Sequence, residues 1–279
     1  MLQGFLGYAR SWGKTSVDFK IGQLSSAFGA FPPRYDDMEN PLIDQPLPYT
    51  YLALRPRPGA EPYGLTPVTL YGLPAAEVDF ALHHFDARFQ LTNGSPYNPR
   101  GILESGQHAQ WTAGGGYTIR QGFRVGVSAY DGAWLNDSMK PLLPPGSTVR
   151  DFPGSGLGID AQWARGHWNA DGEWQHFVFH FPPSSAPACN FGYAELKRII
   201  SPRWYSAVRV NYQENNKQAS GFLLDRQAYE VTLGFRPNRF ELLKVGYEWA
   251  PLEGAPQIHD NVFGVQFITS IDALSHAFK

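Results

Sequence analysis

The sequence contains no apolar run near the roughly 18 residues that would indicate a membrane-spanning helix. A mean hydropathy of −0.33 is also too polar for a helical membrane protein. Charge of one sign is not in excess: the formal net charge is −2, so no bulk field attracts nucleic acid or an anionic membrane surface. The single cysteine, Cys189, excludes an intrachain disulfide. Residues 1–10 lack the basic start and apolar core of a secretory signal.

Aromatic residues, by contrast, make up 15% of the chain, and apolar residues alternate with polar ones over long segments. The clearest example is residues 227–249, which contain two arms separated by Pro237-Asn238-Arg239. The apolar set is Tyr229, Val231, Leu233 and Phe235 in the first arm, and Leu243, Val245, Tyr247 and Trp249 in the second. Alternation with a period of two predicts a β-hairpin with one apolar and one polar face. Each arm has about the 9–11 residues that a tilted strand needs to cross a bilayer.

The same unit recurs along the chain and predicts about 13 strands. They are expected over residues 5–9, 17–21, 77–82, 85–91, 110–119, 123–130, 157–163, 174–181, 194–197, 208–212, 227–236, 240–249 and 263–267. Short and long connections alternate between them, as in bacterial barrels with short periplasmic turns and longer external loops. We therefore expect an all-β fold: one antiparallel transmembrane β-barrel of about 12–16 strands over residues 1–279. Closed bacterial barrels have even strand numbers, so at least one strand is expected upstream of Met1, or a strand is overlooked between residues 24 and 74.

One arm does not follow the simple pattern. Phe177, Phe179 and Phe181 share the face expected to be apolar, whereas Trp174 has the opposite parity. A β-bulge near Gln175 would reconcile the two. Aromatic girdles at the two membrane interfaces are a further expectation, with candidates Trp111, Tyr117, Trp163, Trp174, Tyr247 and Trp249.

Residues 24–74 form a long connection rich in proline, aspartate and tyrosine, with short strands possible at 50–54 and 68–71. Such long connections are uncommon unless they are functional. In a barrel the connection could fold into the lumen and narrow it, with Arg34, Asp36, Asp37 and Asp44 as constriction residues. Oxygen-rich loops can also bind calcium, but the spacing of these acids matches no EF-hand.

Charged residues within the expected strands fall almost always on the face opposite the apolar residues, which predicts a hydrated lumen. The expected pore-lining residues are Lys20, Asp79, Arg88, Arg124, Asp160, Glu195, Arg209, Glu230, Arg236, Lys244 and Glu248. Both signs are interspersed, so the charges could simply pair across strands. A sharper alternative is a basic ladder of Arg88, Arg124 and Arg209 that attracts anions.

Other motifs have plainer readings. His83-His84 beside Asp86 could suggest a metal pair, but a polar hairpin turn explains it, because adjacent strand residues point to opposite faces. The glycines at 114–116 and 154–158 resemble phosphate loops, yet strands rather than helices flank both. No Gly-x-Ser-x-Gly elbow is present, and we assign no catalytic residue, metal or cofactor and expect no enzyme activity.

Three stretches resemble poorly characterised bacterial porin-like outer-membrane proteins, distantly similar to the phosphate-selective porin group. They are residues 28–37, running on to Pro48-Tyr49, then residues 87–93, and residues 201–205. The resemblance implies an outer-membrane diffusion channel and leaves the solute undefined.

The first functional hypothesis is thus a bacterial outer-membrane porin for passive or weakly selective diffusion. Its partners would be outer-membrane lipid, small polar or anionic solutes and possibly further copies of itself, with no nucleic acid. One alternative is a soluble β-sandwich that binds or cleaves carbohydrate. Another is a barrel that serves as a scaffold for a partner protein.

Overall fold

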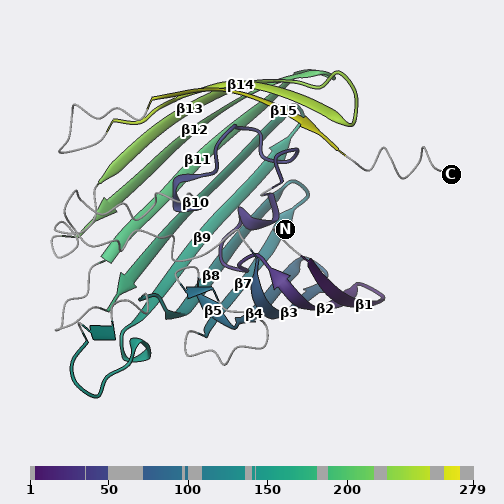
Figure 1. Ribbon diagram of the computed structural model, residues 1–279. Helices are drawn as coiled ribbons and strands as arrows, with labels where there is room; N and C mark the ends of the chain where they lie inside the picture. Colours follow the sequence, from purple (N-terminus) through teal and green to yellow (C-terminus); the bar gives the residue numbers. More distant parts are fainter. Residues whose placement is uncertain are drawn as a thin grey trace.

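The computed structural model describes residues 4–34, 36–49, 72–95, 98–99, 109–135, 140–141, 143–180, 188–216, 225–251 and 261–270. Within them, thirteen strands form one antiparallel sheet (Figure 1). They are β1 (Gly4–Trp12), β2 (Thr15–Leu24), β3 (Leu73–Leu82), β4 (Phe85–Thr92), β7 (Gln110–Arg120), β8 (Phe123–Ala133), β9 (Pro153–Arg165), β10 (Trp168–Phe179), β11 (Ala188–Ser201), β12 (Trp204–Asn215), β13 (Arg226–Phe235), β14 (Glu241–Trp249) and β15 (Val262–Thr269). The predicted fold class and strand count are confirmed.

Minor elements lie in the longer connections. Short 3-10 turns are η1 (Pro32–Arg34), η2 (Leu47–Tyr49) and η4 (Val149–Asp151), and a small separate ribbon pairs β5 (Gly94–Ser95) with β6 (Asn98–Pro99). The ribbon falls between the predicted strands at 85–91 and 110–119, where no strand was predicted. In this part of the chain no helix has the length and apolarity needed to cross a membrane. The possible strands at 50–54 and 68–71 lie outside the described residues.

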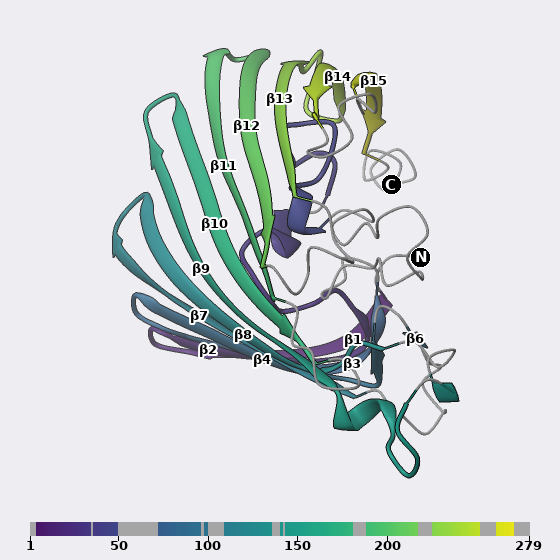
Figure 2. The ribbon, with the colours of Figure 1, turned by 90° about the vertical axis from the view of Figure 1, so that its left-hand side faces the viewer.

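The sheet is strongly curved, and its strands are neighbours in the order in which they occur in the chain (Figure 2). This up-and-down order is that of a barrel wall built from successive hairpins. Within the described residues β1 pairs only with β2, and β15 only with β14, so the sheet is open between them. The additional strand expected from the even-number rule stays a prediction.

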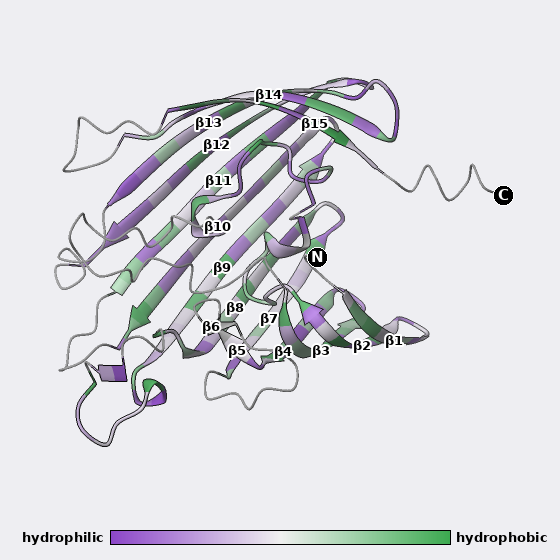
Figure 3. Cartoon of the chain, viewed as in Figure 1, coloured by the Kyte–Doolittle hydropathy of each residue, from purple (hydrophilic) through white to green (hydrophobic). Residues whose placement is uncertain are grey.

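Apolar and polar residues alternate along the strands (Figure 3), and successive side chains of a strand point to opposite faces of the sheet. Val208, Val231 and Tyr247 form a cross-strand row on the convex face and are 46%, 50% and 42% exposed. Their polar neighbours, such as Arg209 and Thr232, are buried on the concave face. No second sheet covers the convex face in the described chain, which removes the arrangement that a β-sandwich requires.

Every connection at one rim of the sheet is short. The turns lie at residues 13–14, 83–84, 121–122, 166–167, 202–203 and 236–240, between the strands β1–β2, β3–β4, β7–β8, β9–β10, β11–β12 and β13–β14. The connections at the opposite rim are longer, as predicted. Register shifts in the sheet occur at Thr118/Arg120 and Ile199/Ser201, next to two of the short turns.

Strand β10 corrects two predictions. It begins at Trp168, not near Trp174, and its register with β9 and β11 is unbroken, so the bulge expected near Gln175 is wrong. Phe177 and Phe179 instead point to the concave face, where they are 0% and 1% exposed. Trp174 therefore has the correct parity for the outer face. Phe181 lies outside the described residues. Strand β11 also begins earlier than the predicted strand at 194–197, because it already includes Ala188 and Cys189.

The turn at His83 holds a non-glycine residue at a φ of 55°. A β-branched residue is disfavoured in this region, whereas asparagine tolerates it. We expect His83→Val to lower the free energy of unfolding by about 1–2 kcal/mol, measured by urea unfolding in detergent micelles. His83→Asn is the control and should unfold at the same urea concentration as the wild type, or higher. Equal stability of the two variants would contradict the prediction.

Candidate functional site

The concave face of the sheet is covered in part by the first segment of the long connection. Residues 25–34 and 36–49 run across it, as Figures 1 and 2 show. Their partners lie on strands far along the chain: Ala27 N–H donates to Gln90 Oε1 at 3.3 Å, and Lys244 Nζ donates to the carbonyl of Leu42 at 2.9 Å. We call residues 25–49 the inner loop.

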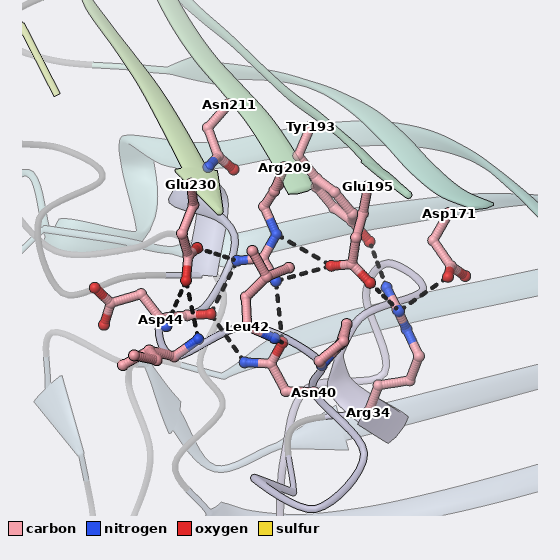
Figure 4. A network of polar contacts seen from close by, with 12 residues as sticks. Arg34, Asn40, Leu42, Asp44, Asp171, Tyr193, Glu195, Arg209, Asn211 and Glu230 are labelled. Carbon is pink, nitrogen blue, oxygen red and sulfur yellow. Dashed lines mark hydrogen bonds and ion pairs between the residues drawn. The ribbon is translucent and has the colours of Figure 1, made fainter. Parts of the chain in front are cut away.

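Arg209, from the middle of β12, is the main anchor of the inner loop (Figure 4). Its side chain is fully buried and forms ion pairs with Glu195 on β11 at 2.8 Å and Glu230 on β13 at 3.3 Å. The same guanidinium donates to the backbone carbonyl of Asp44 at 2.9 Å and to Asn40 Oδ1 at 3.0 Å. A buried charge is costly unless it is paired and hydrogen-bonded, and here the inner loop completes the set of partners.

Glu230 and Asn211 extend the anchor by accepting hydrogen bonds from loop backbone. Glu230 Oε1 accepts the N–H groups of Ile43 at 2.9 Å and Asp44 at 3.2 Å, and Asn211 accepts the N–H of Leu47 at 3.1 Å. These bonds satisfy backbone donors that the loop buries without a strand partner. The polar side chains of the wall therefore replace the missing β-ladder for this segment.

Arg34 joins the network from the loop side. Its guanidinium contacts Asp171 on β10 and Glu195 on β11, each at 3.1 Å, and donates to the hydroxyl of Tyr193 at 3.3 Å. Burial by itself lowers the pKa of Arg34, but Tyr193, Glu195 and Asp171 together raise it above its ordinary value. The result is a chain of alternating charge across the wall, in the order Asp171, Arg34, Glu195, Arg209 and Glu230.

A second anchor combines Glu173 with an aromatic cluster. Glu173 accepts a hydrogen bond from the hydroxyl of Tyr49 at 2.8 Å, and Gln175 donates to both groups at 2.7–2.8 Å. Next to them, loop Phe28 and Phe31 pack with wall aromatics. The wall members of this cluster are Tyr130, Phe177, Phe179, Phe191 and Tyr193. The inward-facing phenylalanines of the wall are thus buried by the inner loop.

The strands nearer the start of the chain keep their charges in smaller pairs. Lys20 contacts Glu77 at 3.1 Å and also Asp79, while Arg124 lies between Asp86 and Asp160 at 2.6 and 2.9 Å. Here cations and acids pair across strands. This agrees with the first of the two hypotheses for the interior charges, pairing across strands, and not with a ladder of unpaired arginines.

The predicted pore-lining residues therefore fall into two groups. Glu195, Arg209, Glu230 and Lys244 are buried beneath the inner loop, and Arg236 donates to the carbonyl of Met38 in that loop. Arg88, on the same concave face, also reaches the inner loop at the carbonyl of Gly29. The others lie on that face outside this patch: Lys20, Asp79, Arg124, Asp160 and Glu248, the last of which faces Arg226 at 3.8 Å. Their pore-lining role stays a prediction.

The basic ladder is not formed as a row of free cations. Arg209 is neutralised by two carboxylates and Arg124 by two more, while Arg88 donates to the carbonyl of Gly29 at 3.4 Å. Among the inward lysines, Lys197 lies over the ring of Tyr205 at 4.8 Å, and no ion pair joins it to another described residue.

Of the predicted constriction residues, Arg34 and Asp44 contact the wall, Asp44 through its backbone. Asp36 caps the local turn by accepting the N–H of Met38 at 2.8 Å, and both Asp36 and Asp37 are exposed. The described residues include no group of three or more His, Cys, Asp or Glu side chains that could hold a metal ion. This leaves calcium binding at residues 34–44 without structural support in that part of the chain.

A cavity of about 360 Å³ remains between the inner loop and the wall. Charged groups of both signs line it, among them Arg34, Glu39, Arg124, Asp171 and Lys197. It extends toward the short turns, since Gly122 and Ala164 also line it. Solutes that enter it meet permanent charges and hydrogen-bonding groups on several sides.

Sequence reasoning missed several residues that hold the inner loop, notably Asn40, Tyr49, Gln90, Glu173 and Gln175. A usable signal existed for the three that lie on strands. Gln90 alternates with the outward Phe89 and Leu91, and Glu173 and Gln175 alternate with the outward Trp174, so all three have inward parity. The partners on the loop carry no comparable signal, because an irregular segment has no period.

One substitution at Arg209 and one at Arg124 compare the arginine that holds the inner loop with an arginine that only forms ion pairs between strands. We expect Arg209→Met to lower the free energy of unfolding by about 3–5 kcal/mol, because Glu195 and Glu230 would stay buried with less compensation. Arg124→Met should cost less, since the side chain of its partner Asp86 is 44% exposed. Urea unfolding in micelles measures both, and equal costs would contradict the role of Arg209.

A second pair of variants tests the seating of the inner loop at Gly29. This residue has a φ of +80°, and an added Cβ would lie 1.8 Å from the hydroxyl of Tyr49 and 2.3 Å from Glu173 Oε1. We expect Gly29→Ala to cost about 1–3 kcal/mol more than Gly13→Ala. Gly13 has a φ of +61° with nothing within 4 Å, so it shares the backbone strain without the clash. Protease cleavage within residues 25–49 should rise in Gly29→Ala alone.

Comparisons with known proteins agree on the fold. No family model and no curated protein matches the sequence. Among solved structures, an anion-selective porin from Comamonas acidovorans has a TM-score of 0.56 at 8% identity, over 95% of this chain and 84% of that one. A porin refined at 1.8 Å has a TM-score of 0.57 at 12% identity, over 91% of this chain and 80% of that one. OmpT of Vibrio cholerae, an outer-membrane protein folded in vitro, has a TM-score of 0.55 at 8% identity, over 92% of this chain and 76% of that one. The chain therefore has the fold of the bacterial outer-membrane porins.

Proposed function

We propose that this protein is a porin of the bacterial outer membrane, through which small polar or charged solutes diffuse. The observation that carries the proposal is the inverted arrangement of the sheet. Apolar side chains such as Val208 and Val231 are exposed on the convex face, and charged side chains are collected on the concave face. This arrangement is favourable when the convex face meets lipid and the concave face meets water.

Aromatic pairs near both rims support insertion into a bilayer. Trp204 packs against Phe235 with ring centroids 4.5 Å apart near the short turns, and Tyr229 stacks on Trp249 at 5.3 Å toward the other rim. On β12 the outward positions from Trp204 to Tyr212 span close to the roughly 9–11 residues that a tilted transmembrane strand needs. Such belts are typical of membrane interfaces.

The inner loop and the cavity beside it support a narrowed, polar path. Opposite charges on the cavity wall can replace part of a solute's hydration without favouring one sign strongly. We therefore infer passive or weakly selective passage of small polar or anionic solutes. A closer relation to the phosphate-selective porin group, contact with outer-membrane lipid and assembly into homo-oligomers belong to the same proposal.

Conductance across a planar bilayer tests the proposal. We expect the purified protein to produce discrete current steps in potassium chloride, and Lys197→Glu to shift the reversal potential toward cation selectivity under a salt gradient, since Lys197 lines the cavity. Lys14→Glu makes the same change of charge in an exposed turn and should shift the potential less. Inserted protein without current steps would favour the scaffold alternative.

A further inference from the structure

The rim with the short turns carries an excess of positive charge. Residues in and next to the six turns include six exposed cations: Lys14, Arg120, Arg165, Arg198, Arg203 and Arg239, which we call the short-turn collar. Five of the six cations lie in a turn or one residue from it, and Arg198 lies beside the turn at 166–167, where Ile199 N–H donates to the carbonyl of His167. The acids within two residues of these turns are Asp86, which faces inward to Arg124, and Glu241. A net charge of −2 for the whole chain conceals this local excess.

None of the collar cations forms an ion pair with another described residue. The opposite rim differs, since described cations and acids occur there together: Arg150 is next to Asp151, and Arg226 faces Glu248 at 3.8 Å. Exposed arginines with no ion-pair partner among the described residues remain available for an external anion.

Three collar-side residues show the direction in which these charges point. Arg165 on β9, Trp168 on β10 and Arg198 on β11 are direct cross-strand partners, so their side chains share one face. That face is the convex one, because Trp163 and Leu196 precede them on it by two positions. The guanidinium of Arg198 lies over the Trp168 ring, 5.0 Å from its centroid. The row thus places two cations around an indole on the outside of the wall, away from the lumen.

We propose that the short-turn collar binds the phosphate groups of anionic phospholipids in the leaflet that meets the short turns. This inference rests on the proposed function, because it requires the wall to be in a bilayer. Tryptophan prefers the headgroup level of a membrane, and guanidinium groups match phosphate in two-point hydrogen bonds. A soluble anion destined for the lumen would have no reason to bind this outer row, which favours a lipid as the ligand.

Spin-labelled lipids test the proposal in reconstituted vesicles. The protein is inserted into phosphatidylcholine vesicles that contain either spin-labelled phosphatidylglycerol or spin-labelled phosphatidylcholine, and the motionally restricted fraction gives the relative association of each lipid. Three variants are compared with the wild type: Arg165→Gln/Arg198→Gln, the charge-preserving Arg165→Lys/Arg198→Lys, and Lys140→Gln/Arg150→Gln, which removes two cations at the opposite rim.

We expect the wild type to prefer phosphatidylglycerol and the double glutamine variant to lose about fivefold of that preference for each of the two cations removed, the contribution of a cation near an anionic surface. The opposite-rim variant should retain it, and the lysine variant, which keeps the charge without the two-point geometry, should lose less than the glutamine variant. Insertion with no preference for phosphatidylglycerol, or an unchanged preference in the double glutamine variant, would overturn the inference alone. Failure of the wild type to insert would overturn the proposed function and, with it, this inference.

Discussion

The buried guanidinium of Arg209 is the interaction on which the interior of this protein depends. A cation with no contact to water needs compensation on every side, and two strands supply only the carboxylates of Glu195 and Glu230. The remaining donors reach Asn40 and the carbonyl of Asp44 in the inner loop. The loop is thus held because removing it would leave buried polar groups of the wall without partners.

The outer face follows a simpler rule. Alternation in the sequence placed the strands correctly because side chains of a strand alternate between its two faces, and a shift by one residue would carry charged side chains onto the apolar convex face. Strand ends were less well predicted. The predicted start of β10, at residue 174, was too late. Asn169 and Asp171 are residue types common in turns, but both pair with β9 in a regular ladder.

The interior was harder to predict for a physical reason. Phe177 and Phe179 were assigned to the apolar outer face, since inward positions of a water-filled barrel should be polar. They are buried because Phe28 of the inner loop provides an apolar surface inside the wall. Parity states which face a side chain occupies, but only tertiary contacts determine whether that face meets water, lipid or another segment. The charged residues near Arg209 could be placed inward, and their partners on the loop could not.

The separation in sequence between the inner loop and its anchors has a consequence for the order of assembly. Hairpins joined by turns such as Gly166-His167 bring together neighbours, at a small cost in chain entropy. Arg34, by contrast, contacts Glu195 across 161 residues, and Leu42 contacts Lys244 across 202. The inner loop lies early in the sequence, but these contacts cannot form until β11 to β14 are in place. The seating of the loop therefore depends on strands that lie far later in the chain.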